Sequence, residues 1–241
     1  MKYIQLRTYL TVVLYMIFGI GFSLLTSCAK YPTGSNGNTT KLLIITMTVA
    51  GQLNPNDVYI VAFNPSTQLN PTTSGPVPVV APPWGNGFLA GNCTYFVRWN
   101  GNFTPQYSIY QFTDTLLNNY VGTGVPVQIT NPPANGNQIS FAIDMSQLAT
   151  SVNQANLYQS IQINFLTMDR IPVGNSGTKN WDALGDGRNA TSINTWITIP
   201  LTTTGTYNNA RFGYIEPTGD VISDGDPDLD ISDFSVQVVQ Q

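Results

Sequence analysis

Apolar residues alternate with polar residues along much of the chain after residue 41. In KLLIITMTV (41–49), one face would carry Leu43, Ile45, Met47 and Val49. The same alternation recurs in QISFAID (138–144), SIQINFLTMD (160–169) and TWITIPL (195–201). Successive side chains of an extended chain point to opposite faces, so each of these segments predicts a β-strand with one buried face.

Other segments extend this pattern. DVYIVAFN (57–64) is apolar on both faces, which is typical of a central strand covered on both sides. We expect further strands at Thr94–Trp99, Ser108–Phe112, Val125–Ile129, Arg211–Ile215 and Leu229–Val239. In the last of these, the apolar positions move from odd to even numbers, which predicts a β-bulge around Ser232–Asp233.

These elements predict an all-β fold, an antiparallel β-sandwich of about ten strands in a single domain over residues 41–241. A half-buried sheet must cover its apolar face with a second layer, and no long helix is available to do so. We expect only a short helix at Met145–Val152, with Asp144 as its N-cap. NPTTSGPVPVVAPPWGNG (70–87) is too rich in proline for a central strand and is expected to be a long surface loop.

Composition narrows the possible chemistry. Charged residues make up 9% of the chain, against roughly 25% in an ordinary soluble domain. There is no histidine, which excludes Ser-His-Asp catalysis, histidine zinc sites and histidine pH switches. The formal net charge is −4 with few, scattered cations, so we expect no nucleic-acid partner.

The first residues indicate export. Lys2 and Arg7 precede the uncharged run YLTVVLYMIFGIGFSLLT (9–26), which has the layout of a secretory signal and is also long enough to be weighed as a membrane anchor. The run ends in Leu25-Thr26-Ser27-Cys28, which resembles the lipobox of bacterial lipoproteins.

That resemblance implies lipid transfer to the Cys28 sulfur and cleavage before Cys28. Residues 1–27 would be the signal peptide and residues 28–40 the lipidated cysteine with a flexible tether. The membrane would be a partner through the lipid anchor, at the cell envelope and on the outer membrane if the organism has two. The alternative is an uncleaved membrane helix in which Cys28 is incidental.

If Cys28 carries lipid, Cys93 has no partner for an intramolecular disulfide. We expect Cys93 to be a buried apolar thiol. A reactive or intermolecular cysteine is the alternative.

Acidic residues gather near the C-terminus, where six of the thirteen lie between Asp220 and Asp233. Asp224, Asp226, Asp228 and Asp230 alternate, and clustered carboxylates of this kind can bind calcium. The alternative is a solvated acidic strand edge that prevents aggregation. Apart from calcium, we expect no cofactor.

The long segment between the strands at 160–169 and 195–201 is the second candidate site. It contains Trp181, Asp182 and Asp186, which are suited to stacking on a sugar ring and hydrogen-bonding its hydroxyls. Trp84 invites the same interpretation, and in both cases the alternative is a tryptophan that fills the core. Asp182 and Asp186 could in principle form a glycosidase pair, but nothing else supports catalysis, so we do not expect an enzyme.

Four segments, FAIDMSQL, INFLTMDRIPV, WDALGD and DLDISDFSVQV, are similar to segments of uncharacterised secreted bacterial lipoproteins. The resemblance implies a binding sandwich rather than an enzyme. The sequence therefore predicts a cell-envelope lipoprotein with a non-catalytic β-sandwich that binds a glycan or a protein. In one form of this hypothesis, bound calcium supports the binding domain. The alternatives are a structural or assembly component of the envelope and, less favoured, a carboxylate-dependent hydrolase.

Overall fold

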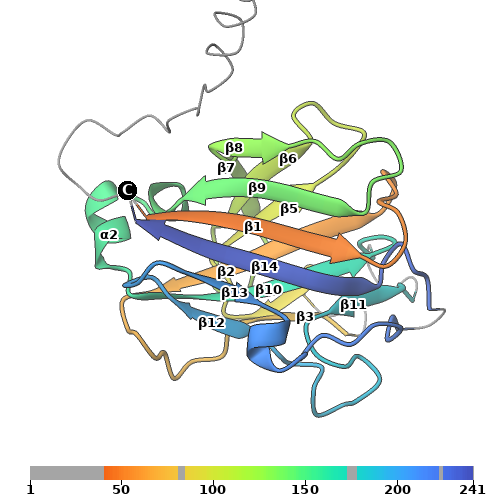
Figure 1. Ribbon diagram of the computed structural model, residues 1–241. Coiled ribbons are helices and arrows are strands. Elements are labelled where there is room, and N and C mark those ends of the chain that lie inside the picture. The colour runs from red at the N-terminus through yellow and green to blue at the C-terminus, as the bar shows by residue number, and fades with distance from the viewer. Residues whose placement is uncertain (1–40, 81–84, 173–177, 223–224, 241) are drawn as a thin grey trace, which may run out of the picture. The chain divides into compact units, whose positions relative to one another are not determined.

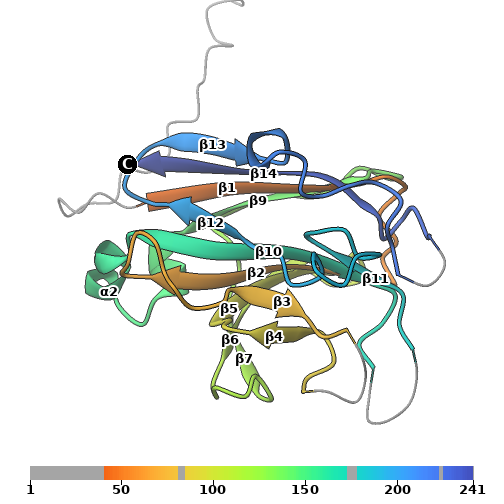
Figure 2. The same ribbon diagram turned by 90° about the horizontal axis from the view of Figure 1, so that it is seen from below.

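Two antiparallel β-sheets face each other and enclose the main hydrophobic core, as seen in Figure 1 and Figure 2. The computed structural model describes residues 41–80, 85–172, 178–222 and 225–240, and these belong to one unit, Asn38–Gln241. The predicted all-β sandwich is confirmed. The described residues form fourteen strands, more than the ten or so expected, because short strands extend the sheets and form a separate hairpin.

The first sheet has five strands in the order β13-β14-β1-β9-β8. These are β13 (Gly205–Asn208), β14 (Ile231–Gln240), β1 (Lys41–Val49), β9 (Gln138–Asp144) and β8 (Gln128–Thr130). Between β1 and β14 the register shifts, so that Thr48 pairs with Asp233 and Val49 pairs with Ile231. Ser232 is the extra residue, which confirms the predicted bulge.

The second sheet has seven strands. Its order is β11-β10-β2-β5-β6-β7, and β12 also pairs with β10. The strands are β11 (Trp181–Ala183), β10 (Ser160–Met168), β2 (Val58–Ser66), β5 (Tyr95–Trp99), β6 (Tyr107–Phe112), β7 (Tyr120–Gly124) and β12 (Ile197–Pro200).

Both faces of β2 are buried, as its continuous apolar pattern predicts. Tyr59, Val61 and Phe63 point into the core between the sheets, whereas Ile60 and Ala62 belong to a second apolar cluster on the outer face of the seven-stranded sheet. The second sheet therefore needs an outer layer as well as its partner sheet.

Burial on both faces also changes the interpretation of β10. Its alternation predicted one solvated polar face, yet all nine of its residues are buried. The polar side chains bond the overlying loops instead. Ser160 Oγ donates to Gln68 O at 2.6 Å, and Asn164 Nδ2 donates to Pro76 O at 2.9 Å.

The proline-rich segment supplies part of this outer layer, so its prediction as a surface loop was partly wrong. Pro76–Pro78 forms β3 and pairs with β4 (Leu89–Gly91) in a two-stranded sheet, which covers the second sheet in Figure 2. Val79 is buried beside β3. Proline is tolerated here because β3 pairs with a strand on one side only and does not need all of its N–H groups.

Other boundaries also differ from the predictions. Arg211–Ile215 is not a strand, because the chain forms a 3₁₀ helix at Ala210–Phe212 and then takes left-handed φ values at Gly213 (77°) and Tyr214 (59°). The strand expected at Val125–Ile129 is β8, three residues later. Every residue of β7 is exposed, so this strand has no buried apolar face from which the sequence could predict it.

A short helix begins at Met145, as predicted, with a capping box formed by Asp144 and Gln147. It is a 3₁₀ helix that ends at Leu148, and α2 (Val152–Leu157) follows it. Among the residues whose structure is described, no helix combines the length and apolar character needed to cross a membrane.

Charged contacts contribute little to this fold. The two ion pairs in the described parts of the chain join near neighbours, Asp169 with Arg170 at 3.6 Å and Asp186 with Arg188 at 2.8 Å. Exposed pairs of this kind stabilise a protein by about 0–1 kcal/mol. Apolar packing and neutral hydrogen bonds therefore hold the sandwich together.

The two sheets are joined by a stacked aromatic pair, which gives a direct test of the core. Phe165 of β10 and Phe234 of β14 have ring centroids 5.0 Å apart. Because Phe165→Ala would leave a cavity between the sheets, we expect it to lower the free energy of unfolding by about 3–5 kcal/mol. Leu116→Ala is the control, since Leu116 is 74% exposed. Urea denaturation measures both, and equal effects of the two substitutions would contradict this description of the core.

Candidate functional site

Three buried carboxylates from two segments of the chain converge at one site. Asp182 lies on β11, while Glu216 and Asp220 lie in the segment between the second 3₁₀ helix and β14. Each offers a ligand oxygen, and these atoms all lie within 4.8 Å of one another. The residues are only 1%, 2% and 0% exposed, respectively. We call Asp182, Glu216 and Asp220 the acidic cluster.

Backbone N–H groups hold the Asp182 carboxylate on both sides. Its Oδ1 accepts from Ala183 N at 2.9 Å, and its Oδ2 accepts from Ile231 N at 2.8 Å. Ile231 is the first residue of β14. Asp182 therefore ties the edge of the second sheet to the start of a strand in the first.

Glu216 is fixed at its backbone and at its side chain. The Asn209 side chain donates to Glu216 O at 2.8 Å and accepts from Glu216 N at 3.1 Å. Glu216 Oε2 accepts from Gly185 N at 3.0 Å. Gly185 has a φ of +101°, and a Cβ there would lie 2.2 Å from Ser192 O, so this position requires glycine.

Two oxygens of the acidic cluster have no hydrogen-bond partner. Asp220 Oδ2 accepts from Gly187 N at 2.8 Å, but Asp220 Oδ1 is buried and unpaired. Glu216 Oε1 is likewise buried and unpaired. Buried polar atoms without partners are rare and point to a missing ligand or proton.

Burial makes these carboxylates hard to ionise. Burial, followed by the charges of Asp182 and Asp220, raises the pKa of Glu216 to about 12. Burial, followed by the charge of Asp220, raises the pKa of Asp182 to about 8, and burial also raises the pKa of Asp220. Asp182 and Glu216 share a side-chain hydrogen bond. Without a cation, the cluster therefore retains protons at neutral pH.

Of the four predicted calcium ligands, Asp230 lies near this cluster. Both of its carboxylate oxygens accept from Gly219 N, at 2.8 and 2.9 Å. Its charge contributes to the raised pKa of Asp182 and of Asp220. Asp182 and Asp230 were predicted as members of two different sites, and the fold brings them together.

Asp226 and Asp228 instead serve the turn that contains them. Asp226 Oδ1 accepts from Asp228 N at 3.0 Å, and Asp228 Oδ1 accepts from Gln52 N at 2.7 Å. Asp224 lies outside the described residues. Of the described aspartates in the alternating run, Asp226 and Asp228 thus belong to a turn, and Asp230 lies near the acidic cluster.

The predicted sugar-stacking residues do not form an open platform. Trp181 is 3% exposed and packs in the outer apolar cluster, with Lys179 Nζ 5.9 Å from its ring centroid. This corrects the stacking role, because the ring has no face open to a ligand. Asp182 is buried, Asp186 pairs at the surface with Arg188, and Trp84 lies outside the described residues.

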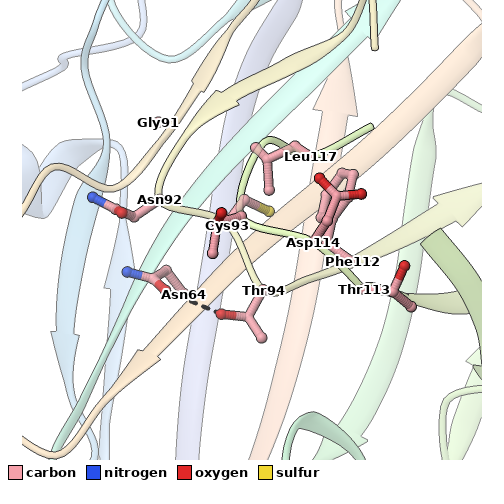
Figure 3. Close-up of a pocket in the computed structure, with 10 residues that line it drawn as sticks. Asn64, Gly91, Asn92, Cys93, Thr94, Phe112, Thr113, Asp114 and Leu117 are labelled. Atoms are coloured by element: carbon pink, nitrogen blue, oxygen red, sulfur yellow. Dashed lines mark hydrogen bonds between the residues drawn. The ribbon is translucent and has the colours of Figure 1, made fainter. Parts of the chain in front are cut away.

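A pocket of about 310 Å³ opens on the outer side of the second sheet (Figure 3). It is lined by Asn64, Gly91, Asn92, Cys93, Thr94, Phe112, Thr113, Asp114, Thr115 and Leu117. Much of its polar wall is bonded internally. Thr94 Oγ1 donates to Asn64 Oδ1 at 3.2 Å, and Asp114 accepts from the backbone of Leu116, Asn118 and Asn119. These groups support the surrounding loops.

A second pocket, of about 210 Å³, lies where β5 and β6 approach their connecting turn. We call it the Arg98 pocket, and it is lined by Arg98, Asn100, Phe103, Thr104, Pro105, Gln106, Ser108 and Tyr110. Arg98 Nε and Gln106 Oε1 are shielded from solvent and have no hydrogen-bond partner. Phe103 is 64% exposed at this pocket.

Arg98 differs from the other cations in the described parts of the chain. Each of the others donates to an oxygen, and these are Lys41, Arg170, Lys179, Arg188 and Arg211. The Arg98 side chain makes no hydrogen bond or ion pair within the described structure. Its guanidinium is therefore available to a ligand of opposite charge.

Comparison with known proteins adds no relative to this description, since no family model, curated protein or solved structure matches the chain.

Sequence reasoning missed Glu216, Asp220 and Arg98 as site residues. Glu216 carried one signal, because it is the single glutamate of the chain. Arg98 carried another, as a charged residue inside a strand of apolar and aromatic residues.

Cys93 lies in the wall of the first pocket as a free, buried thiol. Its Sγ donates to Tyr95 O at 3.3 Å, and burial raises its pKa to about 12. Because the thiolate is the reactive form, we expect Cys93 in the Cys28→Ser chain to resist Ellman's reagent at pH 8 and to react fully in urea. Rapid reaction of the native chain would instead assign Cys93 a redox or intermolecular role.

Proposed function

We propose that the chain is a cell-envelope lipoprotein with a non-catalytic β-sandwich that binds glycans bearing a carboxylate group, and that the Arg98 pocket is its binding site. The observation that carries this proposal is the unpaired Arg98 guanidinium in a pocket whose other lining residues are neutral.

The lining suits an acidic sugar. An arginine side chain binds a carboxylate through two parallel, charge-assisted hydrogen bonds. Around Arg98, the amides of Asn100 and Gln106 and the hydroxyls of Ser108 and Tyr110 offer partners for sugar hydroxyls. Phe103 supplies an exposed aromatic ring for the apolar face of a sugar. The carboxylate of a peptide C-terminus could also bind Arg98, but a peptide would form fewer hydrogen bonds with these amide and hydroxyl groups than a sugar.

The chemistry of the pocket favours binding over hydrolysis. Glycosidases generally need two carboxyl groups on either side of the bond that is cleaved. The residues that line the Arg98 pocket include neither aspartate nor glutamate. This supports a module that retains its ligand without cleaving it.

An exposed edge of the sandwich favours a second candidate function, as an assembly component of the envelope. β7 and β8 lie at the ends of the two sheets, and Val121, Val125, Val127 and Ile129 along this stretch are between 39% and 52% exposed. Unpaired edge strands can add a strand from another protein. Envelope proteins that co-purify with the chain and are lost with Val121→Lys would support this second candidate.

Glycan binding provides the first test of the proposed function. We expect the full-length chain in detergent to bind uronate- or sialate-containing oligosaccharides and to ignore neutral glucans. Arg98→Gln should weaken binding about 10- to 100-fold, since hydrogen bonds to charged groups contribute about 1.5–3 kcal/mol. Isothermal titration calorimetry measures the affinity, and Arg170→Gln is the matched control because Arg170 lies outside the pocket. Unchanged affinity in Arg98→Gln would refute the site.

Lipidation provides the second test. We expect wild-type chain expressed in a bacterium with lipoprotein processing to lose residues 1–27 and to gain acyl mass at Cys28. Cys28→Ser should remain as the full-length precursor, because the lipid acceptor is gone, whereas Cys93→Ser should be processed like the wild type. Intact-mass spectrometry of the membrane fraction distinguishes the three. Equal, unprocessed mass for wild type and Cys28→Ser would contradict the lipobox interpretation.

A further inference from the structure

The acidic cluster contains more negative charge than its surroundings compensate. The guanidinium of Arg188 acts on Asp220 through its charge, but its hydrogen bonds go to Asp186 Oδ1 at 2.8 Å and to Gly219 O at 3.3 Å. Among the residues that the structure describes, no ion pair involves Asp182, Glu216 or Asp220. The backbone N–H groups described above satisfy only part of the oxygens.

Carboxylates in such a position need either protons or a metal ion. Moving an ion out of water costs several kcal/mol even after relaxation of the protein. A proton shared between Asp182 and Glu216 would neutralise one charge, but Asp220 Oδ1 would remain buried without a partner. A divalent cation between the three carboxylates would satisfy both unpaired oxygens at once.

We propose that Asp182, Glu216 and Asp220 form a binding site for one calcium ion. One carboxylate oxygen from each residue lies within 4.8 Å of the other two, and calcium takes oxygen ligands at about 2.3–2.6 Å. Two oxygens on opposite sides of a calcium ion are thus about 4.6–5.2 Å apart, so the cluster is already close to the required size. Glu216 Oε1 and Asp220 Oδ1 are the two oxygens that the fold leaves free for the ion.

Burial favours calcium over magnesium at this site. Magnesium gives up its water reluctantly and usually keeps several water ligands. The three residues are at most 2% exposed, and their backbone donors fix them in place, so the site has little room for a hydrated ion. A larger, more flexible coordination shell of protein oxygens suits calcium better.

The site would join two segments that are distant in the sequence. Asp182 belongs to β11, Glu216 follows the 3₁₀ helix at Ala210–Phe212, and Asp220 approaches the isolated bridge between Trp181 and Ile222. A bound ion would lock these segments together. Removing calcium should therefore loosen this end of the sandwich and lower thermal stability.

The experiment uses the full-length chain in detergent, freed of metal with a chelator. We expect calorimetric titration with calcium chloride to show one ion per chain. At a calcium concentration 100-fold above Kd, the melting temperature should rise by about 5–10 °C, and equal magnesium should raise it much less. Terbium in the same site should give luminescence on tryptophan excitation, because Trp181 adjoins Asp182, and Trp181→Phe should reduce it.

Variants distinguish this site from the exposed acidic run. Glu216→Gln and Asp220→Asn preserve shape but remove a charge, and each should weaken calcium binding at least 10-fold and abolish most of the thermal shift. The double variant Asp226→Asn/Asp228→Asn is the matched control and should respond like the wild type. If the control loses calcium binding while Glu216→Gln keeps it, the ion binds the exposed run and the proposal fails.

The wild-type titration keeps the test decisive even if a variant does not fold. A metal-free wild-type chain that shows no calcium heat, no terbium luminescence and no change in melting temperature would overturn the proposal. That result would mean that protons neutralise the buried carboxylates.

Discussion

The burial of β10 on both faces is the constraint on which the rest of the structure depends. Its inward side chains pack in the core between the sheets, so its outward polar side chains must find partners in an overlying layer. Asn164 shows how this works, since its side chain donates to Pro76 O and Thr195 O and accepts from Leu184 N. Gln162 Nε2 likewise donates to Thr73 O. Each outward polar residue of β10 therefore positions a loop.

The same principle accounts for the composition of the chain and for its candidate sites. The backbone N–H and C=O groups of loops have no hydrogen-bond partners within a sheet. Neutral amide and hydroxyl side chains can bond them without the cost of burying a charge. Where aspartate or glutamate takes this role, backbone N–H groups bond both oxygens of Asp182 and one oxygen of Glu216, while the negative charge still needs compensation. Arg98 presents the opposite case, as a positive charge that no group in the described structure compensates. Both sites arise from charges that the fold positions but does not pair.

Sequence periodicity predicted the sandwich well because the alternation of side chains between the two faces of a strand is a local property. It identified the long strands, the bulge at Ser232 and the doubly buried β2. It failed where conformation depends on distant contacts, as in the exposed β7 and in the proline hairpin that covers the second sheet. No spacing rule predicts the acidic cluster, since Asp182 meets Glu216 and Asp220 only through long-range packing. Asp182 was nevertheless identified, whereas Glu216 follows no repeating pattern.

The scarcity of charged contacts has a consequence for the environment that this domain tolerates. Dissolved ions screen exposed charge pairs but leave apolar packing and buried neutral hydrogen bonds nearly unaffected. The two ion pairs in the described structure are local and weak, so screening has little to remove. The stability of the sandwich should therefore change little between low and high ionic strength.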